Sequence, residues 1–293
     1  MRAMLRRWWM LAALWALASC RAPAPAPPTD GWTPMFDGVE FRAWVRSEPR
    51  LMRLYAARID LHADGVDVLV TPGNGPRRKD HDAQTTSMFA RRHDCQLAIN
   101  ASPFSPVFQN HGGPKDVRGV SMSRGRLDSP PNGKYGAIAF GRERPATIFD
   151  GSVRIEDLHG FDHVVGGFEV VLRDGVDVSA RATEVRGVHP RVAVGLSRDA
   201  RFLYILVVDG RQRGFSQGAS LADLAAVLAE LGADDGLNFD GGGSSAFVAQ
   251  RGDTWAQLNV PNHMLRRGVE RVVPNHLCVY ARALGEAPAS PQR

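Results

Sequence analysis

Apolar and polar residues alternate along much of the chain between residues 35 and 283, and this period of two is typical of β-strands. Turn residues separate several of these segments at hairpin spacing, as in His62-Ala63-Asp64-Gly65. Paired strands are expected at 54–61 with 65–71, at 135–140 with 147–149, and at 191–197 with 202–208. Single strands are expected at 96–100, 236–239, 246–249 and 275–280. The pattern therefore predicts a fold built mainly of antiparallel sheet.

One segment has the periodicity of a helix. Its apolar positions repeat at i, i+3, i+4 and i+7 and are Leu221, Leu224, Ala225, Leu228 and Leu231. Ser220 can cap this helix, with Asp223 in the capping-box position, and Gly232 supplies a stop. We therefore expect an α+β fold, with a mixed, largely antiparallel sheet and few helices, in a single domain over residues 35–283.

The two ends of the chain lack such patterns. Residues 1–19 resemble a lipoprotein signal peptide, with a basic start, a short apolar core from Trp8 to Leu17, and Leu-Ala-Ser directly before Cys20. Residues 20–34 are rich in Pro and Ala, which favours an extended tether, and residues 284–293 are expected to be a disordered tail. We expect lipid attachment at Cys20. Because Arg21 and not Asp follows it, the usual sorting rule favours anchoring in the outer membrane of a bacterial envelope.

The signal peptide also changes the charge of the protein. The whole chain has a formal net charge of +5, but Arg2, Arg6 and Arg7 lie before the expected cleavage point, so the mature chain carries about +2. This balance argues against a nucleic-acid-coating surface. Only three lysines are present, so cationic chemistry must come mainly from arginines, whose forked guanidinium suits phosphate and carboxylate.

The cysteines and histidines do not by themselves predict a disulfide or a metal site. Cys95 and Cys278 could form a disulfide in an exported protein or remain as two buried thiols, and their spacing does not decide between these. The run Lys79-Asp80-His81-Asp82 contains metal-ligand types, but a charged surface loop is the commoner meaning of such a run. We therefore expect no bound metal and no cofactor.

The candidate functional residues lie in turns next to the ends of expected strands. Asp240-Gly241-Gly242-Gly243-Ser244-Ser245 follows the strand after the helix, and such a run can bring several backbone N–H groups to one anion. Asp209-Gly210-Arg211 follows the most hydrophobic strand, and Glu270-Arg271 precedes the last one. These turns predict a site that combines carboxylates with guanidinium groups.

These motifs resemble those of the phosphodiester glycosidase family. The resemblance rests on Pro190-Arg191, Asp209-Gly210-Arg211, the helix start at Ser220-Leu221, the run from Asn238 to Ser245, and Glu270-Arg271-Val272-Val273-Pro274-Asn275. Upstream, Ala98-Ile99-Asn100 is similar to the family strand that leads into two glycines and two aromatic residues. Here Ala101-Ser102-Pro103-Phe104 follows instead, which indicates a different sugar preference if this loop lines the site.

The resemblance implies an enzyme that hydrolyses a sugar-1-phosphodiester, with a phosphorylated glycan as substrate. The carboxylates it indicates as catalytic are Asp240 first, then Glu270 and Asp209. The substrate-binding residues it indicates are Asn100, Arg191, Arg211, Gly241, Gly242, Gly243, Ser244, Ser245 and Arg271. Which carboxylate acts as acid and which as nucleophile stays open.

Two other functions are compatible with the sequence. Gly242-Gly243-Ser244-Ser245-Ala246 nearly fits the nucleophile elbow of a serine hydrolase, with Asp253, His263 and His276 following, although a strand and not a helix is expected after the serine. A protein that only binds anionic surface polysaccharide could use the same anion site without turnover.

The lipid anchor can be tested directly. We expect a radiolabelled fatty acid to be incorporated into the wild-type chain in cells and not into Cys20→Ala, because the other two cysteines lie far from the export signal. Labelled protein recovered from the Cys20→Ala variant would contradict the anchor.

Overall fold

The computed structural model describes residues 25–76, 79–107, 112–182 and 187–285. The expected signal peptide, Cys20 and residues 286–293 of the expected tail lie outside the described residues. No helix within the described ranges has the length and apolar character needed to cross a membrane.

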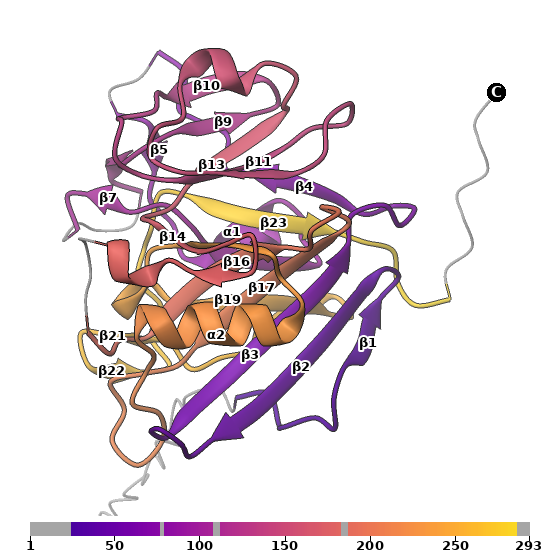
Figure 1. Cartoon of the computed structure of the whole chain (residues 1–293), viewed down its shortest axis with the longest axis vertical. Helices are drawn as coiled ribbons and strands as arrows, with labels where there is room; N and C mark the ends of the chain where they lie inside the picture. Colours follow the sequence, from indigo (N-terminus) through magenta and orange to yellow (C-terminus); the bar gives the residue numbers. More distant parts are fainter. Residues whose placement is uncertain (1–24, 77–78, 108–111, 183–186, 286–293) are drawn as a thin grey trace, which may run out of the picture.

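Strands dominate the structure, and they form three larger sheets (Figure 1). The eight-stranded sheet has the order β1 (Thr33–Phe36), β2 (Val39–Arg46), β3 (Met52–Asp60), β17 (Phe202–Val208), β16 (Arg191–Leu196), β18 (Asp235–Asn238), β14 (Val170–Arg173) and β15 (Val176–Asp177). The central five-stranded sheet has the order β20 (Thr254–Gln257), β19 (Phe247–Arg251), β6 (Leu97–Asn100), β23 (His276–Tyr280) and β4 (Asp67–Val70). The outer five-stranded sheet has the order β10 (Arg126–Ser129), β9 (Ser121–Ser123), β13 (His163–Gly166), β11 (Ala137–Phe140) and β12 (Thr147–Phe149).

The remaining elements are short. Two small sheets are formed by β5 (His81–Asp82), β8 (Pro114–Val117) and β7 (Phe104–Ser105), and by β21 (Asn262–His263) with β22 (Arg266–Arg267). The helices are α1 (Thr86–Arg92) and α2 (Leu221–Leu231), with single 3-10 turns at Ile155–Leu158, Ser179–Arg181 and Gly242–Ser244. The expected α+β class, with largely antiparallel sheet and few helices in one domain, is confirmed.

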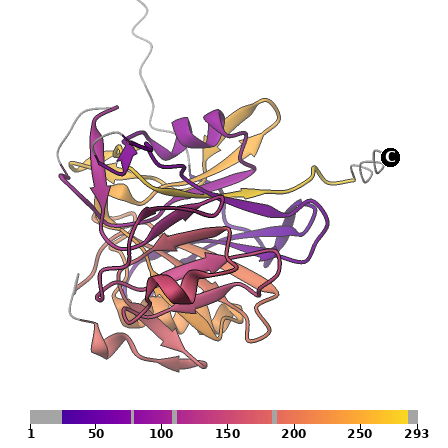
Figure 2. The same cartoon turned by 90° about the horizontal axis from the view of Figure 1, so that it is seen from above.

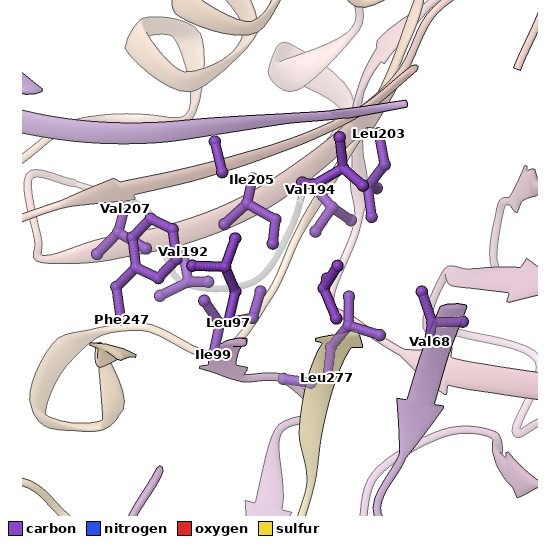
Figure 3. Packing of buried hydrophobic residues seen from close by; sticks show 14 of the residues in the cluster. Val68, Leu97, Ile99, Val192, Val194, Leu203, Ile205, Val207, Phe247 and Leu277 are labelled. Carbon is purple, nitrogen blue, oxygen red and sulfur yellow. The ribbon is translucent and has the colours of Figure 1, made fainter. Parts of the chain in front are cut away.

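The core lies between the eight-stranded sheet and the central five-stranded sheet. Val192, Val194, Ile205 and Val207 face inward from the first sheet, and residues of β6, β19 and β23 meet them from the second (Figure 3). The labelled side chains interdigitate there, and all are essentially inaccessible to solvent apart from Val68 at 6%. Both sheets are covered on their outer faces, so these central strands are buried on two sides.

Helix α2 covers the outer face of the eight-stranded sheet, where it crosses the strands in Figure 1. Its apolar stripe packs on a surface that includes Leu54, Ala193 and Leu206. The expected caps are present: Ser220 Oγ accepts from the amide of Asp223, the Asp223 carboxylate accepts from the amide of Ser220, and Gly232 is left-handed with φ +108°. Local sequence and tertiary packing therefore agree along this helix.

Helix α1 covers the outer face of the central sheet and was not predicted. It is only seven residues long, and its buried side chains are Thr86, Phe89 and Ala90, too few to give a helical period. Phe89 and Ala90 pack beside Cys95 and Cys278, which are joined by a disulfide with a Cα–Cα distance of 5.5 Å. The structure thus decides the question that the cysteine spacing left open.

The predicted pairing of 54–61 with 65–71 is wrong, although both segments contain strands. β3 pairs with β2 and β17 in the eight-stranded sheet, whereas β4 pairs with β23 in the central sheet. Alternation shows that a segment is a strand but does not show which edge it joins, and here both edges of β3 are taken by other strands. The pairs β11–β12 and β16–β17 are confirmed.

The segment expected to be a tether is partly packed on the domain. The Ala26 amide donates to Leu258 O, the Thr29 amide donates to Ala43 O, and Trp32 packs against the α2 side of the sheet. Strand β1 starts at Thr33, two residues before the expected domain boundary. Figure 2 views the same layers from above, with α2 on the side away from α1.

The N-cap and the buried face of α2 should contribute differently to stability, and the two contributions can be ranked. Ser220→Ala should lower the free energy of unfolding by about 1 kcal/mol through loss of the cap. Leu228→Ala should lower it by about 2–5 kcal/mol because Leu228 is fully buried and truncation leaves a cavity. Chemical denaturation of the two variants measures both values, and the opposite ranking would contradict the packing of this helix.

Candidate active site

The glycine loop, residues 239–246, is the crossover between the two large sheets. It leaves β18 in the eight-stranded sheet and enters β19 in the central sheet. The amides of Phe239 and Gly242 donate to Val192 O and Pro190 O, and the amide of Asp240 donates to Ala101 O. The loop is therefore held from both sheets, and Asp240 starts it at the end of a buried strand.

Asn100 fixes the same loop from the central sheet. Its Nδ2 donates to Asp240 O at 2.6 Å, and its Oδ1 accepts from the amide of Ala246 at 3.0 Å. Asn100 is 1% exposed, so its amide group is used in supporting the loop and does not face solvent. Its expected substrate-binding role is replaced here by a positioning role.

Two arginines lie against the glycines. A Cβ on Gly242 would be 3.1 Å from Arg211 Nη1, and a Cβ on Gly243 would be 2.6 Å from Arg271 Nη2. Arg211 contacts His189 Nδ1 through Nη2 at 3.1 Å. The guanidinium groups thus flank the loop from two different turns, as the sequence predicted.

Arg271 is oriented by two side chains. Its Nε donates to His263 Nδ1 at 3.2 Å, and its Nη1 donates to Ser244 Oγ at 3.2 Å. Ser244 is 1% exposed and also hydrogen-bonds the Asp240 carboxylate. Ser244 therefore connects the carboxylate and the guanidinium group and keeps both in place.

Asp240 is the carboxylate of the site, and its pKa is shifted from the usual value. Burial raises its pKa to about 6, while the hydrogen bond from Ser244 and the positive charges of Arg271 and Arg211 act in the opposite direction. Among the described residues, no ion pair within 4.0 Å joins Asp240 to either arginine. The charges influence one another without neutralising contact, which leaves the guanidinium groups available to an anionic ligand.

The predicted nest of backbone amides does not form as expected. The Gly242 amide donates to Pro190 O, and the Ser244 amide donates to Gly241 O. The Gly241 amide hydrogen-bonds the Asp240 carboxylate. Since these three amides are used within the protein, the positive charge at the site comes mainly from the two arginines.

Asp209 lies away from this cluster. It is 1% exposed, and its carboxylate accepts from Tyr55 Oη, Asn259 Nδ2 and the Val260 amide, all at 3.0–3.1 Å. Burial raises its pKa to about 7, against the effect of these hydrogen bonds. Such a buried carboxylate holds the turn before Arg211 against the segment at Val260, and it has no surface to offer a substrate.

Glu270 is also turned away from Asp240. Its carboxylate accepts from the Ser87 amide at 3.0 Å, from the Ser87 hydroxyl, and from Gln257 Nε2 at 2.7 Å. It therefore ties the turn before Arg271 to the first turn of α1. The hydrogen bonds of Glu270 to Ser87 and Gln257, and those of Arg271 to His263 and Ser244, show that the two neighbouring side chains are used in different places.

Two further expected binding residues are buried. Arg191 is 1% exposed and donates through Nε to Ala219 O and through Nη2 to Gly187 O, so it supports the backbone behind the loop. Ser245 is also 1% exposed, and its carbonyl accepts from Asn259. The structure therefore brings together Asp240, the three glycines, Ser244, Arg211 and Arg271, with Asn100 beneath them.

Lys115 is a basic residue near this group that sequence reasoning did not select. It is fully buried in β8, its Nζ donates to Pro106 O at 2.8 Å, and it lies 5.1 Å from the centre of the Phe104 ring. Burial lowers its pKa, and the charge of Arg271 lowers it further. The only sequence signal for Lys115 was that lysine is rare in this chain, and rarity does not show where in the fold the residue lies.

The geometry does not support a serine hydrolase. Strand β19 follows the glycine loop, as expected, and the Ser244 hydroxyl contacts Arg271 instead of a histidine. His276 is fully buried, stacks on Phe89 at 4.4 Å and contacts Thr71 through Nδ1. Within the described ranges no group of three or more His, Cys, Asp or Glu residues is arranged to hold a metal ion.

The different roles of the two aspartates predict different effects on stability. Asp209→Asn should lower the free energy of unfolding by about 1–3 kcal/mol, because an amide cannot accept from all of the buried donors around it. Asp253→Asn, in the exposed turn between β19 and β20, is the matched control and should have little effect. Denaturant titration measures both, and an Asp209→Asn midpoint equal to that of the control would contradict the structural role.

Comparison with solved structures shows a shared fold. The catalytic domain of zebrafish N-acetylglucosamine-1-phosphodiester alpha-N-acetylglucosaminidase, auto-inhibited by its pro-peptide, superposes with a TM-score of 0.65 at 20% identity, over 88% of this chain and 87% of that one. A hypothetical protein from Synechocystis gives 0.63 at 15% identity, over 84% of this chain and 62% of that one. A putative exported protein from Burkholderia pseudomallei gives 0.58 at 14%, over 78% and 74%.

The sequence comparisons give the family. No curated protein sequence matches the chain. The family model of the phosphodiester glycosidases matches residues 93–280, which is more than half of the chain and includes the glycine loop, Arg211 and Arg271. This chain belongs to the phosphodiester glycosidase family.

Proposed function

We propose that the protein hydrolyses a sugar-1-phosphodiester linkage in a cell-envelope or extracellular glycan. The observation that carries the proposal is that Asp240 lies within the electrostatic reach of Arg211 and Arg271, on a crossover held from two sheets. Membership of the phosphodiester glycosidase family supports the class of bond. The zebrafish relative, whose name specifies an N-acetylglucosamine-1-phosphodiester, is consistent with it.

The reaction breaks the bond between the anomeric carbon and a phosphodiester oxygen. The bonding electron pair stays on that oxygen, which leaves as a phosphomonoester anion, and water supplies a hydroxyl to the anomeric carbon and releases a proton. Since phosphate leaves as a stable anion, a strong general acid is less necessary than in ordinary glycosides. Fixed positive charge around the leaving group then provides more of the stabilisation. Arg211 and Arg271 are placed to provide it, and a guanidinium fork matches two phosphate oxygens.

Asp240 acts in its ionised form in this proposal. With a pKa of about 6 it is mostly charged at pH 7 and above. A carboxylate at this position stabilises the positive charge that develops at the anomeric carbon, either electrostatically or by direct attack. Ser244 and Arg271 orient it, and Asn100 fixes the backbone from which it projects. One catalytic carboxylate thus replaces the three that the sequence indicated.

The loop after Asn100 is proposed to shape the sugar preference. Ala101 O accepts from the Asp240 amide, so the start of this loop lies directly beside the site. Phe104 packs against Lys115, whose pKa is lowered by burial and by the charge of Arg271. Because the family glycines and aromatic residues are absent here, the preferred sugar is proposed to differ from N-acetylglucosamine.

We also propose that the protein is exported and anchored in the outer membrane through lipid on Cys20. The signal-like start and the position of Cys20 after small residues support this proposal. Substrate would then be a glycan that reaches the envelope or its surroundings.

Replacement of Asp240 is the decisive test of function. Asp240→Asn should lower kcat by several orders of magnitude with the fold intact, because the amide keeps the shape and loses the charge. Asp253→Asn should retain wild-type turnover. Arg211→Lys should be milder than Asp240→Asn because it keeps the charge but loses the fork.

Assays on a panel of sugar phosphodiesters with matching unphosphorylated glycosides measure the turnover of these variants. Full activity in Asp240→Asn would exclude the catalytic role, and tight binding without turnover by the wild type would favour a polysaccharide-binding function.

The protonation state of Asp240 predicts the pH profile. Because the ionised form is required, kcat/KM should rise with pH through about 6 and level off above it. Initial rates of sugar phosphodiester hydrolysis between pH 4 and 9 measure this limb. A profile that instead falls as pH rises through 6 would assign Asp240 the role of a proton donor.

A further inference from the structure

A cavity lies at the end of the molecule away from Asp240. Its volume is about 740 Å³, and it is lined by the beginning of β4, the β9–β10 turn, the β11–β12 turn, the beginning of β13 and the β16–β17 turn. The candidate active site lies at the opposite end of the β16–β17 hairpin, beside Pro190 and Asp209. Six residues of extended strand put the two sites roughly 20 Å apart.

His163 is the most deeply buried polar side chain of this cavity. It is 8% exposed, and its Nδ1 accepts from the backbone amides of Val70 and Arg124, both at 3.4 Å. An acceptor at Nδ1 places the proton of the neutral ring on Nε2. Burial lowers the pKa of His163, which favours this neutral form. Nε2 has no hydrogen-bond partner among the described residues and is not sealed from solvent, so it offers a donor to the cavity.

Two arginines beside His163 are also available. Arg124 and Arg142 line the cavity and are exposed, and within the described ranges neither guanidinium group has an ion pair or hydrogen bond. The charges of both act on His163. Arg144 differs, because its Nη1 donates to His159 O at 2.6 Å and its guanidinium lies 4.3 Å from the centre of the Phe161 ring. The cavity therefore presents two unused guanidinium forks and a third that is already engaged.

Two carboxylates also line the cavity and act on His163. Asp67 and Asp162 line the cavity, and their negative charges raise the pKa of His163 against the effect of burial. Neither is paired with Arg124 or Arg142 in the part of the chain that the structure describes. A ligand that carries only negative charge would satisfy the arginines and be repelled by the carboxylates.

A sugar with an acidic group satisfies both kinds of residue. Its carboxylate or phosphate can accept from guanidinium forks and from an imidazole N–H, and its hydroxyl groups can donate to carboxylates. The cavity volume falls within the roughly 300–1,000 Å³ that small-molecule sites occupy, which is enough for a short oligosaccharide. The mixed charge of the lining thus selects for a polar ligand with one anionic group.

We propose that this cavity binds an acidic saccharide, a sugar unit carrying a carboxylate or a phosphate, at a site separate from Asp240. Arg124 and Arg142 bind the anionic group, His163 donates from Nε2, and Asp67 and Asp162 accept from sugar hydroxyls. This site does not depend on the proposed hydrolysis. It would give the protein a second binding site for an anionic glycan.

Calorimetric titration of the full chain tests the site. The probes are a trisaccharide ending in glucuronate, a trisaccharide ending in a sugar phosphate, a neutral trisaccharide of the same length, and inorganic phosphate. We expect at least one acidic trisaccharide to bind, and the one that binds identifies the anionic group. The double variant Arg124→Ala, Arg142→Ala should weaken that binding about a hundredfold or more, since two charge-assisted hydrogen bonds are lost and each is worth about a decade or more.

Matched variants separate the site from general charge effects and from the active site. Arg251→Ala removes an exposed arginine at the end of β19 and should bind as the wild type does. His163→Asn keeps an acceptor near the position of Nδ1 and removes the Nε2 donor, so it should weaken binding, with thermal denaturation to verify the fold. Asp240→Asn should leave binding unchanged, and the double arginine variant should hydrolyse a small sugar phosphodiester as the wild type does.

Several outcomes would overturn the proposal. They are equal affinity of the double variant and the Arg251→Ala control, equal affinity for the neutral trisaccharide, and equal affinity for inorganic phosphate. Loss of binding in Asp240→Asn would place the ligand at the active site instead. An absence of hydrolytic activity in every protein would count against the proposed function alone, because the titrations do not require turnover.

Discussion

The crossover from the eight-stranded sheet to the central sheet is the constraint on which the site depends. Between Phe239 and Ala246 the chain leaves one sheet and joins the other, and Asn100 bonds both ends of this passage. This buried side-chain amide pairs the Asp240 carbonyl and the Ala246 amide, two peptide groups that would otherwise cost free energy if left unpaired in the interior. Asp240 therefore projects from backbone whose position is set by both sheets, and the catalytic role proposed for it would need that rigidity.

The glycines follow from the same constraint. Gly242 has φ +61°, a left-handed conformation that most residues adopt only at a cost. A Cβ on Gly241 would lie 2.5 Å from Pro190 O, so a side chain there would push the loop away from the sheet. At Gly243 the same atom would displace the Arg271 guanidinium. The run had suggested amides that bind an anion, yet its role here is to let backbone and arginine side chains approach closely.

Local patterns predicted the parts of the fold that are determined locally. The β16–β17 hairpin, α2 with its caps and the strand before the glycine loop all combine a clear period with turn or capping residues. The pairing of β3 with β4 was wrong because alternation carries no information about which edges meet. Helix α1 was missed because seven residues packed under a disulfide need no amphipathic period.

The candidate site was predicted at the level of turns and not of side-chain direction. In Glu270-Arg271 and in Asp209-Gly210-Arg211 the arginine reaches the glycine loop while the carboxylate is used beneath it. Sequence shows that an acid and an arginine are neighbours, but only the folded strand shows which of them faces outward. The buried carboxylates still matter to the site, because each holds the turn that carries its arginine.

Ion pairing with a carboxylate distinguishes two groups of arginines among the described residues. Arg58 with Glu40, Arg173 with Asp235 and Arg201 with Asp60 are ion pairs at or near the surface, where such pairs add little stability. Arg211 and Arg271 near Asp240, and Arg124 and Arg142 in the cavity beside His163, have no ion pair with a carboxylate among the described residues. A guanidinium kept free of ion pairs in a partly enclosed place attracts an anion more strongly than one already neutralised. With so few lysines in the chain, we expect an anionic glycan where two such arginines line one site together, as Arg211 does with Arg271 and Arg124 with Arg142, and total charge does not locate such a site.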